Sequence, residues 1–248
     1  MQLIGSFIFT LYFLVSILAW SVVVALMIFA SHATRFRAVQ MWSRSIMTML
    51  RVCCGLTYRV EGADNFPDDA VVILQKHSST WETIAGMLYC PPHTWVLKRE
   101  LMWIPLLGIA LRSVRVIPIN RKGRRDAINQ VIEHGTDRLS AGINVMIYPE
   151  GTRVQGARNG RFGRSGSLLA ASSGASVVPV AHNAGEFWGR HSLRKRAGCV
   201  QVVIGKPIPT QGRSAEQINT EAARWMDETM ARISHVGHPP SSTAEPSS

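Results

Sequence analysis

The sequence predicts an α/β fold, an open, mostly parallel sheet flanked by helices, with an N-terminal helical segment that anchors the chain to a membrane. First, short apolar runs of strand length alternate with longer segments of helical periodicity, which is typical of a parallel sheet covered by helices. Second, the length of 248 residues is enough for one such domain with a sizeable core. Third, no charged side chain occurs from residue 3 to residue 31.

The uncharged run at residues 3–30 is longer than the roughly 20 apolar residues that cross a bilayer. A cleaved signal peptide has a positive n-region and a shorter apolar run, so we expect this segment to be retained. Arginines follow it at once, and the positive-inside rule places them on the cytoplasmic side. The segment either spans the bilayer or folds back with its neighbour as a monotopic hairpin, and the sequence leaves both open.

A second helix is predicted at residues 38–56, where apolar residues recur at helical spacing and Arg44 and Arg51 lie off that stripe. An amphipathic helix with a basic face fits the headgroup level of a membrane. The alternative is that its apolar stripe packs on the domain core. We therefore expect residues 1–56 to form the anchor, residues 57–236 the folded α/β domain and residues 237–248 a disordered tail.

The rest of the chain is predicted to alternate between strands and helices. Strands are expected at residues 71–74, 115–119, 144–148, 176–181 and 199–204, and helices from near Ser79 to before Pro91 and at residues 124–139, 167–172 and 215–233. No internal repeat is visible.

The formal net charge of +11 indicates an anionic partner. The apolar N-terminus favours anionic membrane lipid, and we expect no nucleic-acid partner. The four cysteines and the histidines lack metal-ligand or disulfide spacing, so no metal is expected. Free thiols are typical of a reducing compartment. We therefore expect the α/β domain on the cytoplasmic face of the inner membrane.

Polar motifs follow three of the predicted strands. Lys76-His77 comes after the first, Asn120-Arg121 after the second, and the run from Pro149 to Arg153 after the third. In open parallel sheets, ligands bind outside the carboxyl ends of the strands. The three motifs therefore predict an active site at one edge of the sheet.

His77 and Glu82 are the candidate catalytic pair. Five residues correspond to about 140° around an ideal helix, so the two side chains meet only if His77 lies in the loop before the helix and Glu82 in its first turn. A carboxylate bonded to one imidazole nitrogen leaves the other free as a base. Such a base suffices when the acceptor's own hydroxyl attacks a thioester. The alternatives are a structural histidine and a capping box from Ser79 to Glu82.

Several motifs together resemble the glycerolipid acyltransferase superfamily. His77-x4-Glu82 resembles its H-x4-D block, and the run from Tyr148 to Arg153 resembles its F-P-E-G-T-R block. Further resemblance lies at residues 98–108, 119–121 and 178–181. The motifs keep the family's order over nearly half of the chain, and the chain length and apolar N-terminus also match bacterial members. Two positions depart from the pattern: Glu82 replaces the usual aspartate, and Arg115 replaces a common glycine, which puts local acceptor binding in doubt.

The resemblance implies a role for each matching residue. His77 would be the general base and Glu82 its orienting carboxylate. Arg121 and Arg153 would bind the acceptor's phosphate through their guanidinium forks, and Lys98 could add a third positive charge. Glu150, Gly151 and Thr152 would complete the acceptor site: Glu150 by orienting Arg153 or the glycerol, and Gly151 by letting backbone N–H groups approach the substrate.

The activity implied is transfer of a fatty-acyl group to the sn-2 hydroxyl of 1-acylglycerol-3-phosphate (lysophosphatidic acid), giving phosphatidic acid without metal or cofactor. The donor would be acyl-coenzyme A or acyl-carrier protein. One alternative is an acyltransferase for another lysolipid, such as a lyso-aminolipid. Another is a catalytically silent membrane-binding module. Chain length would depend on an apolar tunnel that the sequence does not locate.

Overall fold

The computed structural model describes residues 2–120, 123–154 and 162–236. Its strands in chain order are β1 (Leu56–Glu61), β2 (Val72–Gln75), β3 (His93–Lys98), β4 (Ile117–Ile119), β5 (Asn144–Ile147), β6 (Val177–His182) and β7 (Gly198–Ile204). Its helices are α1 (Gln2–Leu26), α2 (His32–Cys54), α3 (Trp81–Tyr89), α4 (Leu107–Ser113), α5 (Arg124–Ser140), α6 (Ser165–Ser173) and α7 (Ala215–Ile233). Short 3-10 turns η1, η2 and η3 occur at Ala63–Asn65, Arg99–Trp103 and Ala184–Glu186.

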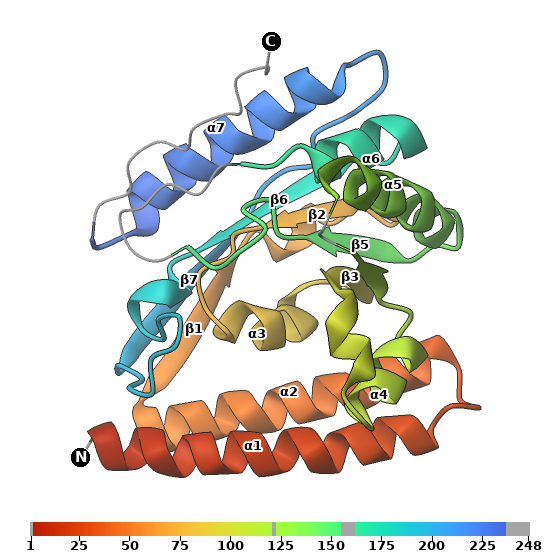
Figure 1. Ribbon diagram of the computed structural model, residues 1–248. Coiled ribbons are helices and arrows are strands. Elements are labelled where there is room, and N and C mark those ends of the chain that lie inside the picture. The colour runs from red at the N-terminus through yellow and green to blue at the C-terminus, as the bar shows by residue number, and fades with distance from the viewer. Residues whose placement is uncertain (1, 121–122, 155–161, 237–248) are drawn as a thin grey trace.

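The strands form one sheet in the order β1-β7-β6-β2-β5-β3-β4. All neighbouring pairs are parallel except β6 and β7, which run antiparallel. Helices α5, α6 and α7 cover one face, and α1, α2 and α3 cover the other (Figure 1). The predicted fold class, an open and mostly parallel sheet between helices, is confirmed.

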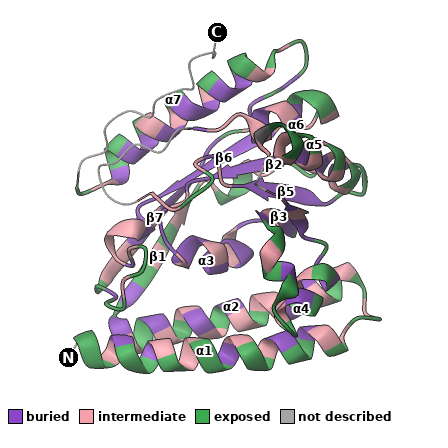
Figure 2. Cartoon of the chain, in the orientation of Figure 1, coloured by how far each residue is buried: buried purple, intermediate pink, exposed green. Residues whose placement is uncertain are grey.

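Two apolar clusters fill the space between these layers. Val72, Val145 and Val177 of the sheet pack with Leu169 of α6 and Ala222 of α7 on one face. On the other face the sheet packs on α2 and α3, with Phe9 of α1 among the buried residues. The central strands are buried throughout, as Figure 2 shows, which is why β2, β5 and β6 read as continuous apolar runs in the sequence.

Local signals fix where several helices begin and end. Helix α2 is capped at its start by Ser31, whose side chain accepts the N–H of Thr34, and at its end by Gly55, which takes the left-handed conformation (φ 66°) that suits glycine. Helix α7 begins with a capping box between Ser214 and Gln217. Its observed bounds coincide with the predicted ones.

Four elements differ from the prediction. Strand β1 was missed, and Leu56, assigned to the helix before it, is the first residue of that strand. Strand β3 and helix α4 were also missed. Helix α2 begins at His32, six residues before the predicted start at residue 38. The predicted tail, residues 237–248, lies outside the described residues.

The apolar stripe of α2 packs on the domain core. Ile46, Leu50 and Cys54 are buried with Trp81 of α3, while Arg44 and Arg51 are exposed. Of the two interpretations left open by the sequence, core packing is therefore the one observed for this stripe. Its basic face stays free to meet a partner.

Helix α1 lies along α2 and against the domain rather than apart from it (Figure 1). The hydroxyl of Ser6 accepts the backbone N–H of Lys195 at 2.9 Å, and Lys195 Nζ donates to Thr10 Oγ1 at 2.6 Å. Farther along, Trp42 of α2 donates its indole N–H to Ser16. The opposite face of α1 is apolar and exposed, with Phe7, Leu11, Leu14, Val15 and Leu18 each more than half accessible.

Candidate functional site

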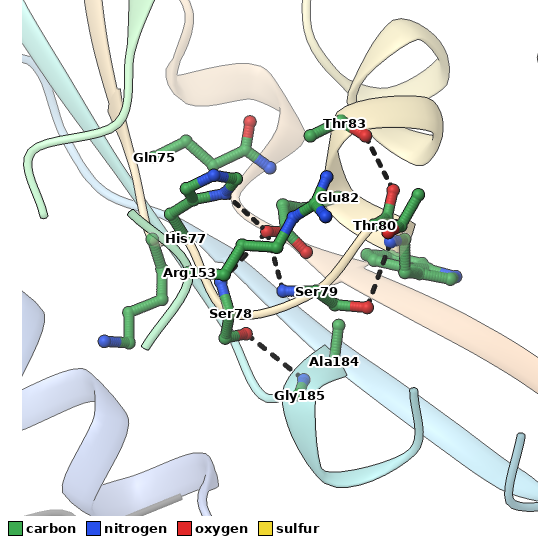
Figure 3. A network of polar contacts seen from close by, with 12 residues as sticks. Gln75, His77, Ser78, Ser79, Thr80, Glu82, Thr83, Arg153, Ala184 and Gly185 are labelled. Carbon is green, nitrogen blue, oxygen red and sulfur yellow. Dashed lines mark hydrogen bonds and ion pairs between the residues drawn. The ribbon is translucent and has the colours of Figure 1, made fainter. Parts of the chain in front are cut away.

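His77 and Glu82 meet at the carboxyl end of β2. His77 lies in the loop after the strand and Glu82 in the first turn of α3 (Figure 3). The imidazole Nδ1 lies 2.9 Å from Glu82 Oε1. With Glu82 ionised, Nδ1–H is the donor, so the other ring nitrogen, Nε2, carries a free lone pair. This is the loop-to-helix geometry that the five-residue spacing required.

The same carboxylate oxygen also binds two backbone groups. The N–H groups of Ser78 and Ser79 each donate to Glu82 Oε1 at 2.9 Å. Only half of the predicted capping box is present, because the Ser79 hydroxyl accepts the N–H of Trp81 instead of that of Glu82. Glu82 thus holds the loop and the imidazole through one atom.

Glu82 is fully buried, yet it stays ionised. Burial raises the pKa of its carboxyl, but the imidazoles of His182 and His77 and the N–H of Ser79 outweigh that effect and leave the pKa below its usual value. Its second oxygen, Oε2, is buried without a hydrogen-bond partner and lies 3.9 Å from His182 Nε2. A charged orienting group is therefore in place next to His77.

The loop after β5 fixes the backbone of His77 from the other side. Glu150 accepts Lys76 Nζ at 2.8 Å and the His77 N–H at 3.2 Å, and the N–H of Val154 donates to the His77 carbonyl at 2.9 Å. The Lys76–Glu150 ion pair is nearly buried, with side chains 7% and 3% exposed. Glu150 therefore contacts the histidine loop and not Arg153, so in this structure it positions His77.

Arg153 and Lys98 lie with His77 on the wall of one pocket of about 410 Å³. Arg153 Nε is buried and has no hydrogen-bond partner. The pocket size falls in the range of about 300–1,000 Å³ typical of ligand sites. Apart from this polar end the lining is largely apolar, supplied by α1, α2, α3, β3 and α4. The pocket wall thus carries one histidine and two cationic side chains among mostly apolar residues.

The remaining predicted site residues are Gly151, Thr152 and Arg121. Gly151 and Thr152 are exposed on the loop after β5. Gly151 has a φ of 66°, which favours glycine, and its N–H donates to the Tyr148 carbonyl in the turn. That N–H is thus engaged within the loop. Arg121 lies outside the described residues.

Two site residues were not singled out from the sequence. The Tyr148 ring stacks on the His77 imidazole with centroids 4.2 Å apart. His182 is fully buried next to Glu82, donates Nε2–H to the Lys76 carbonyl and accepts the N–H of Ala184 at Nδ1. Burial lowers the pKa of His182. Tyr148 was visible as the first residue of the motif after β5; His182 gave no signal beyond lying at the end of a strand.

Comparison with known proteins agrees with this geometry. The acyltransferase family profile matches residues 57–183. A 1-acyl-sn-glycerol-3-phosphate acyltransferase of Pseudomonas aeruginosa is 38% identical over 96% of both chains. The chain belongs to the acyltransferase family. The resemblance predicted from the motifs is confirmed, and the family supports an O-acyltransferase activity.

Two further matches are less similar in sequence. The human 1-acyl-sn-glycerol-3-phosphate acyltransferase alpha is 28% identical over 83% of this chain and 74% of its own. The crystal structure of the 1-acyl-sn-glycerophosphate acyltransferase of Thermotoga maritima superposes with a TM-score of 0.78, covering 94% of this chain and 98% of that one at 20% identity. At that identity, the second likeness shows the fold.

Proposed function

We propose that this acyltransferase moves a fatty-acyl group from a thioester to the sn-2 hydroxyl of 1-acylglycerol-3-phosphate, giving phosphatidic acid for phospholipid synthesis. The observation that carries the proposal is the His77–Glu82 pair, whose histidine lies on the wall of an apolar pocket that Arg153 also lines. The Pseudomonas relative, named for this acceptor and 38% identical over 96% of the chain, supports it. The presence of both members of the pair, with a charged carboxylate, counts against a silent membrane-binding module.

In the proposed reaction His77 acts as general base and then as general acid. Nε2 takes the proton of the acceptor hydroxyl while the hydroxyl oxygen attacks the thioester carbonyl. When the tetrahedral intermediate collapses, the C–S bond breaks and the imidazolium returns the proton to the leaving thiolate. Glu82 keeps the proton on Nδ1 before the reaction and stabilises the imidazolium during it.

The apolar part of the pocket is suited to bind an acyl chain. Its lining includes Val24 of α1, Ile84 of α3 and Leu97 of β3. Burying methylene groups there contributes about 0.8 kcal/mol each. We propose that the donor's acyl chain lies in this pocket; coenzyme A and acyl-carrier protein both fit as thioester carriers.

The acceptor's phosphate is proposed to bind Arg153, with Arg121 and Lys98 as further cations and Thr152 and Gly151 at the same loop. Replacing Arg153 by Ala is expected to weaken acceptor binding by about 1.5–3 kcal/mol, the usual loss for a charged hydrogen bond. The loss belongs mainly in the KM for the acceptor, with the KM for the donor little changed. Steady-state kinetics measure both.

The control for Arg153 is Arg224→Ala, which removes an exposed arginine of α7 on the opposite side of the sheet. It is expected to leave both KM values unchanged. An equal loss for the Arg153 variant on a phosphate-free monoacylglycerol would contradict the phosphate assignment.

A panel of lysolipids tests the acceptor itself. Purified full-length protein with one acyl thioester is given lysophosphatidic acid, larger lysophospholipids and a lyso-aminolipid. We expect the highest kcat/KM on lysophosphatidic acid. A higher value on another lysolipid would overturn the acceptor, and no turnover on any would leave only the membrane-binding function.

We also propose that residues 1–56 anchor residues 57–236 to the inner membrane from its cytoplasmic face, with α1 lying in the plane of the interface. Helix α1 is long and apolar enough to cross a bilayer, but it packs along the domain through Ser6, Thr10 and Ser16 and exposes one apolar face. A helix held flat against a domain presents that face to one leaflet. Exposed Trp103 and Ile109 extend the same kind of surface onto η2 and α4.

Full-length protein is expected to stay with the membrane fraction in both high salt and carbonate. The reason is that the exposed face of α1 is apolar, and these washes release proteins held by charge. The double variant Leu11→Glu with Leu18→Glu, which charges that face, is expected to release much of the protein. Fractionation followed by immunoblotting measures this. Release of the unaltered protein by either wash would contradict the anchor.

A further inference from the structure

A second pocket lies where the α1–α2 turn meets the end of α4, at the other end of α2 from Cys54 (Figure 1). Its volume is about 740 Å³, and its lining includes Arg35, Arg112 and Arg115 with His32 and no acidic side chain. None of the three arginines forms an ion pair within the described ranges. The pocket therefore gathers positive charge that the fold itself does not neutralise.

Two polar atoms in this pocket are buried without a partner: Arg35 Nε and His32 Nε2. The Arg35 guanidinium is oriented by its bond from Nη1 to the Ile28 carbonyl at 2.9 Å. Helix α2 also begins here, and its first N–H groups and dipole favour an anion. Oriented donors, a helix N-terminus and uncompensated charge together suit a phosphate group.

The backbone at Arg115 is held in a conformation that non-glycine residues seldom adopt. Its φ is 61°, and its carbonyl accepts both Thr94 Oγ1 at 2.9 Å and Arg138 Nε at 3.1 Å. A glycine, the residue common at this position in the resembling family, would adopt this conformation without steric cost. The chain instead places an exposed arginine side chain at the pocket.

Besides burial, the positive charges around the pocket also lower the pKa of His32. Burial lowers the pKa of His32, and the charges of Arg35, Arg115 and Arg138 lower it further, against a bond to the Val114 carbonyl. The adjacent His93 is neutral, since burial lowers its pKa to about 4. An anion in the pocket would offset the positive charge of Arg35, Arg112 and Arg115, which line it.

The rim of the pocket is apolar and exposed. Ile28 and Ile109 line the pocket and are 51% and 43% accessible, and Phe29, the next residue in the chain after Ile28, is 99% accessible. A free phosphate ion would gain nothing from such a rim. A membrane phospholipid would, because its acyl chains lie beside the apolar residues while its phosphate enters the pocket.

We propose that Arg35, Arg112 and Arg115 form a binding site for the phosphate of an anionic membrane phospholipid, separate from the acyl-transfer site at His77. The site rests on the proposed membrane attachment through α1. It would fix the rotation of the α1–α2 pair against the leaflet by holding one headgroup at the helix turn.

Native mass spectrometry of full-length protein in dodecyl maltoside micelles tests the site, with phosphatidylglycerol or phosphatidylcholine of the same chains added. We expect one retained phosphatidylglycerol and much weaker retention of phosphatidylcholine. Arg112→Gln with Arg115→Gln is expected to weaken phosphatidylglycerol binding about tenfold or more, as for lost charged contacts. The control, Lys206→Gln with Arg224→Gln, removes the same charge from α7 and the segment that leads to it, and is expected to bind normally.

Arg115→Gly separates binding from folding, because glycine adopts the left-handed conformation without strain while the guanidinium is removed. It is expected to keep or raise the Tm and still bind phosphatidylglycerol several-fold more weakly. Equal binding of both lipids, or equal loss in both double variants, would overturn the site. Displacement of the lipid by millimolar inorganic phosphate would show a free-phosphate site and overturn the lipid assignment.

Turnover of a short-chain, detergent-dispersed lysophosphatidic acid distinguishes this proposal from the function proposed above. The arginine variants are expected to keep normal turnover, since none of these side chains lines the pocket of His77. Carbonate extraction of the same variants reports α1 anchoring independently. Loss of lipid selectivity with normal turnover and anchoring is the expected pattern; unaltered protein that lacks turnover but binds phosphatidylglycerol would count against the proposed function alone.

Discussion

Replacing His77 by Ala is expected to slow turnover by about 10² to 10⁴, the usual contribution of a positioned general base. Nε2 is the ring nitrogen left free by the Nδ1 bond to Glu82, and the imidazole lies on the wall of the pocket. Since the proton transfer occurs in the transition state, the loss belongs in kcat more than in either KM. Single-turnover kinetics with purified protein measure the chemical step directly.

The fold is expected to survive this change. The Ser78 and Ser79 N–H groups still bind Glu82, and the backbone bonds from Glu150 and Val154 to residue 77 do not involve the imidazole. His235→Ala removes an exposed histidine after α7 and serves as the control. Near-normal turnover of a folded His77 variant, judged by its Tm, would remove His77 from the mechanism.

The parts of the fold that the sequence predicted are those whose residue pattern fits only one kind of element. Central strands such as β2 are buried on both faces, so their apolar runs are continuous, and α7 has both an apolar period and a capping box. Strand β1 carried a signal that was overlooked: Leu56, Tyr58 and Val60 alternate toward the core. Because the apolar period of α2 continues to Cys54, Leu56 was assigned to the helix.

Strand β3 and helix α4 could not be predicted in the same way. The lining of the first pocket includes residues of both, among them Val96 and Ala110, so part of their apolar surface faces a cavity and not a packed neighbour. Their pattern therefore fits neither a fully buried strand nor a simple amphipathic helix. The apolar chamber itself is built from segments distant in the chain, which is why the sequence did not locate it.

The polar site was predictable because its chemistry is local. His77 and Glu82 are five residues apart and come together through one loop and one helical turn. The role of Glu150 depends on β5 lying beside β2, a register that the strand patterns do not reveal. Its carboxylate therefore appeared as a substrate ligand in the sequence, whereas in the structure it contacts Lys76 and the backbone of His77.

Replacing Glu82 by Gln is expected to leave a folded but nearly inactive protein. The carboxylate oxygen Oε1 accepts three N–H groups, and the amide oxygen of Gln can accept the same three. Its NH₂ group would occupy the position of Oε2, which is buried without a partner, so the free energy of unfolding falls by about 1–3 kcal/mol at most. Capping of α3 is thus retained while the charge is lost.

The charge is what catalysis requires. A neutral amide does not stabilise the imidazolium that forms when His77 takes the proton, and an acid-to-amide change in a serine protease triad costs about 10⁴ in turnover. Glu82→Asp keeps the charge and restores the family's usual residue, so it is expected to retain substantial activity. Turnover and Tm measured for both variants separate the roles, because the cap and the orienting group share one oxygen atom. Normal turnover in the Gln variant would leave Glu82 a helix cap and His77 without a catalytic partner.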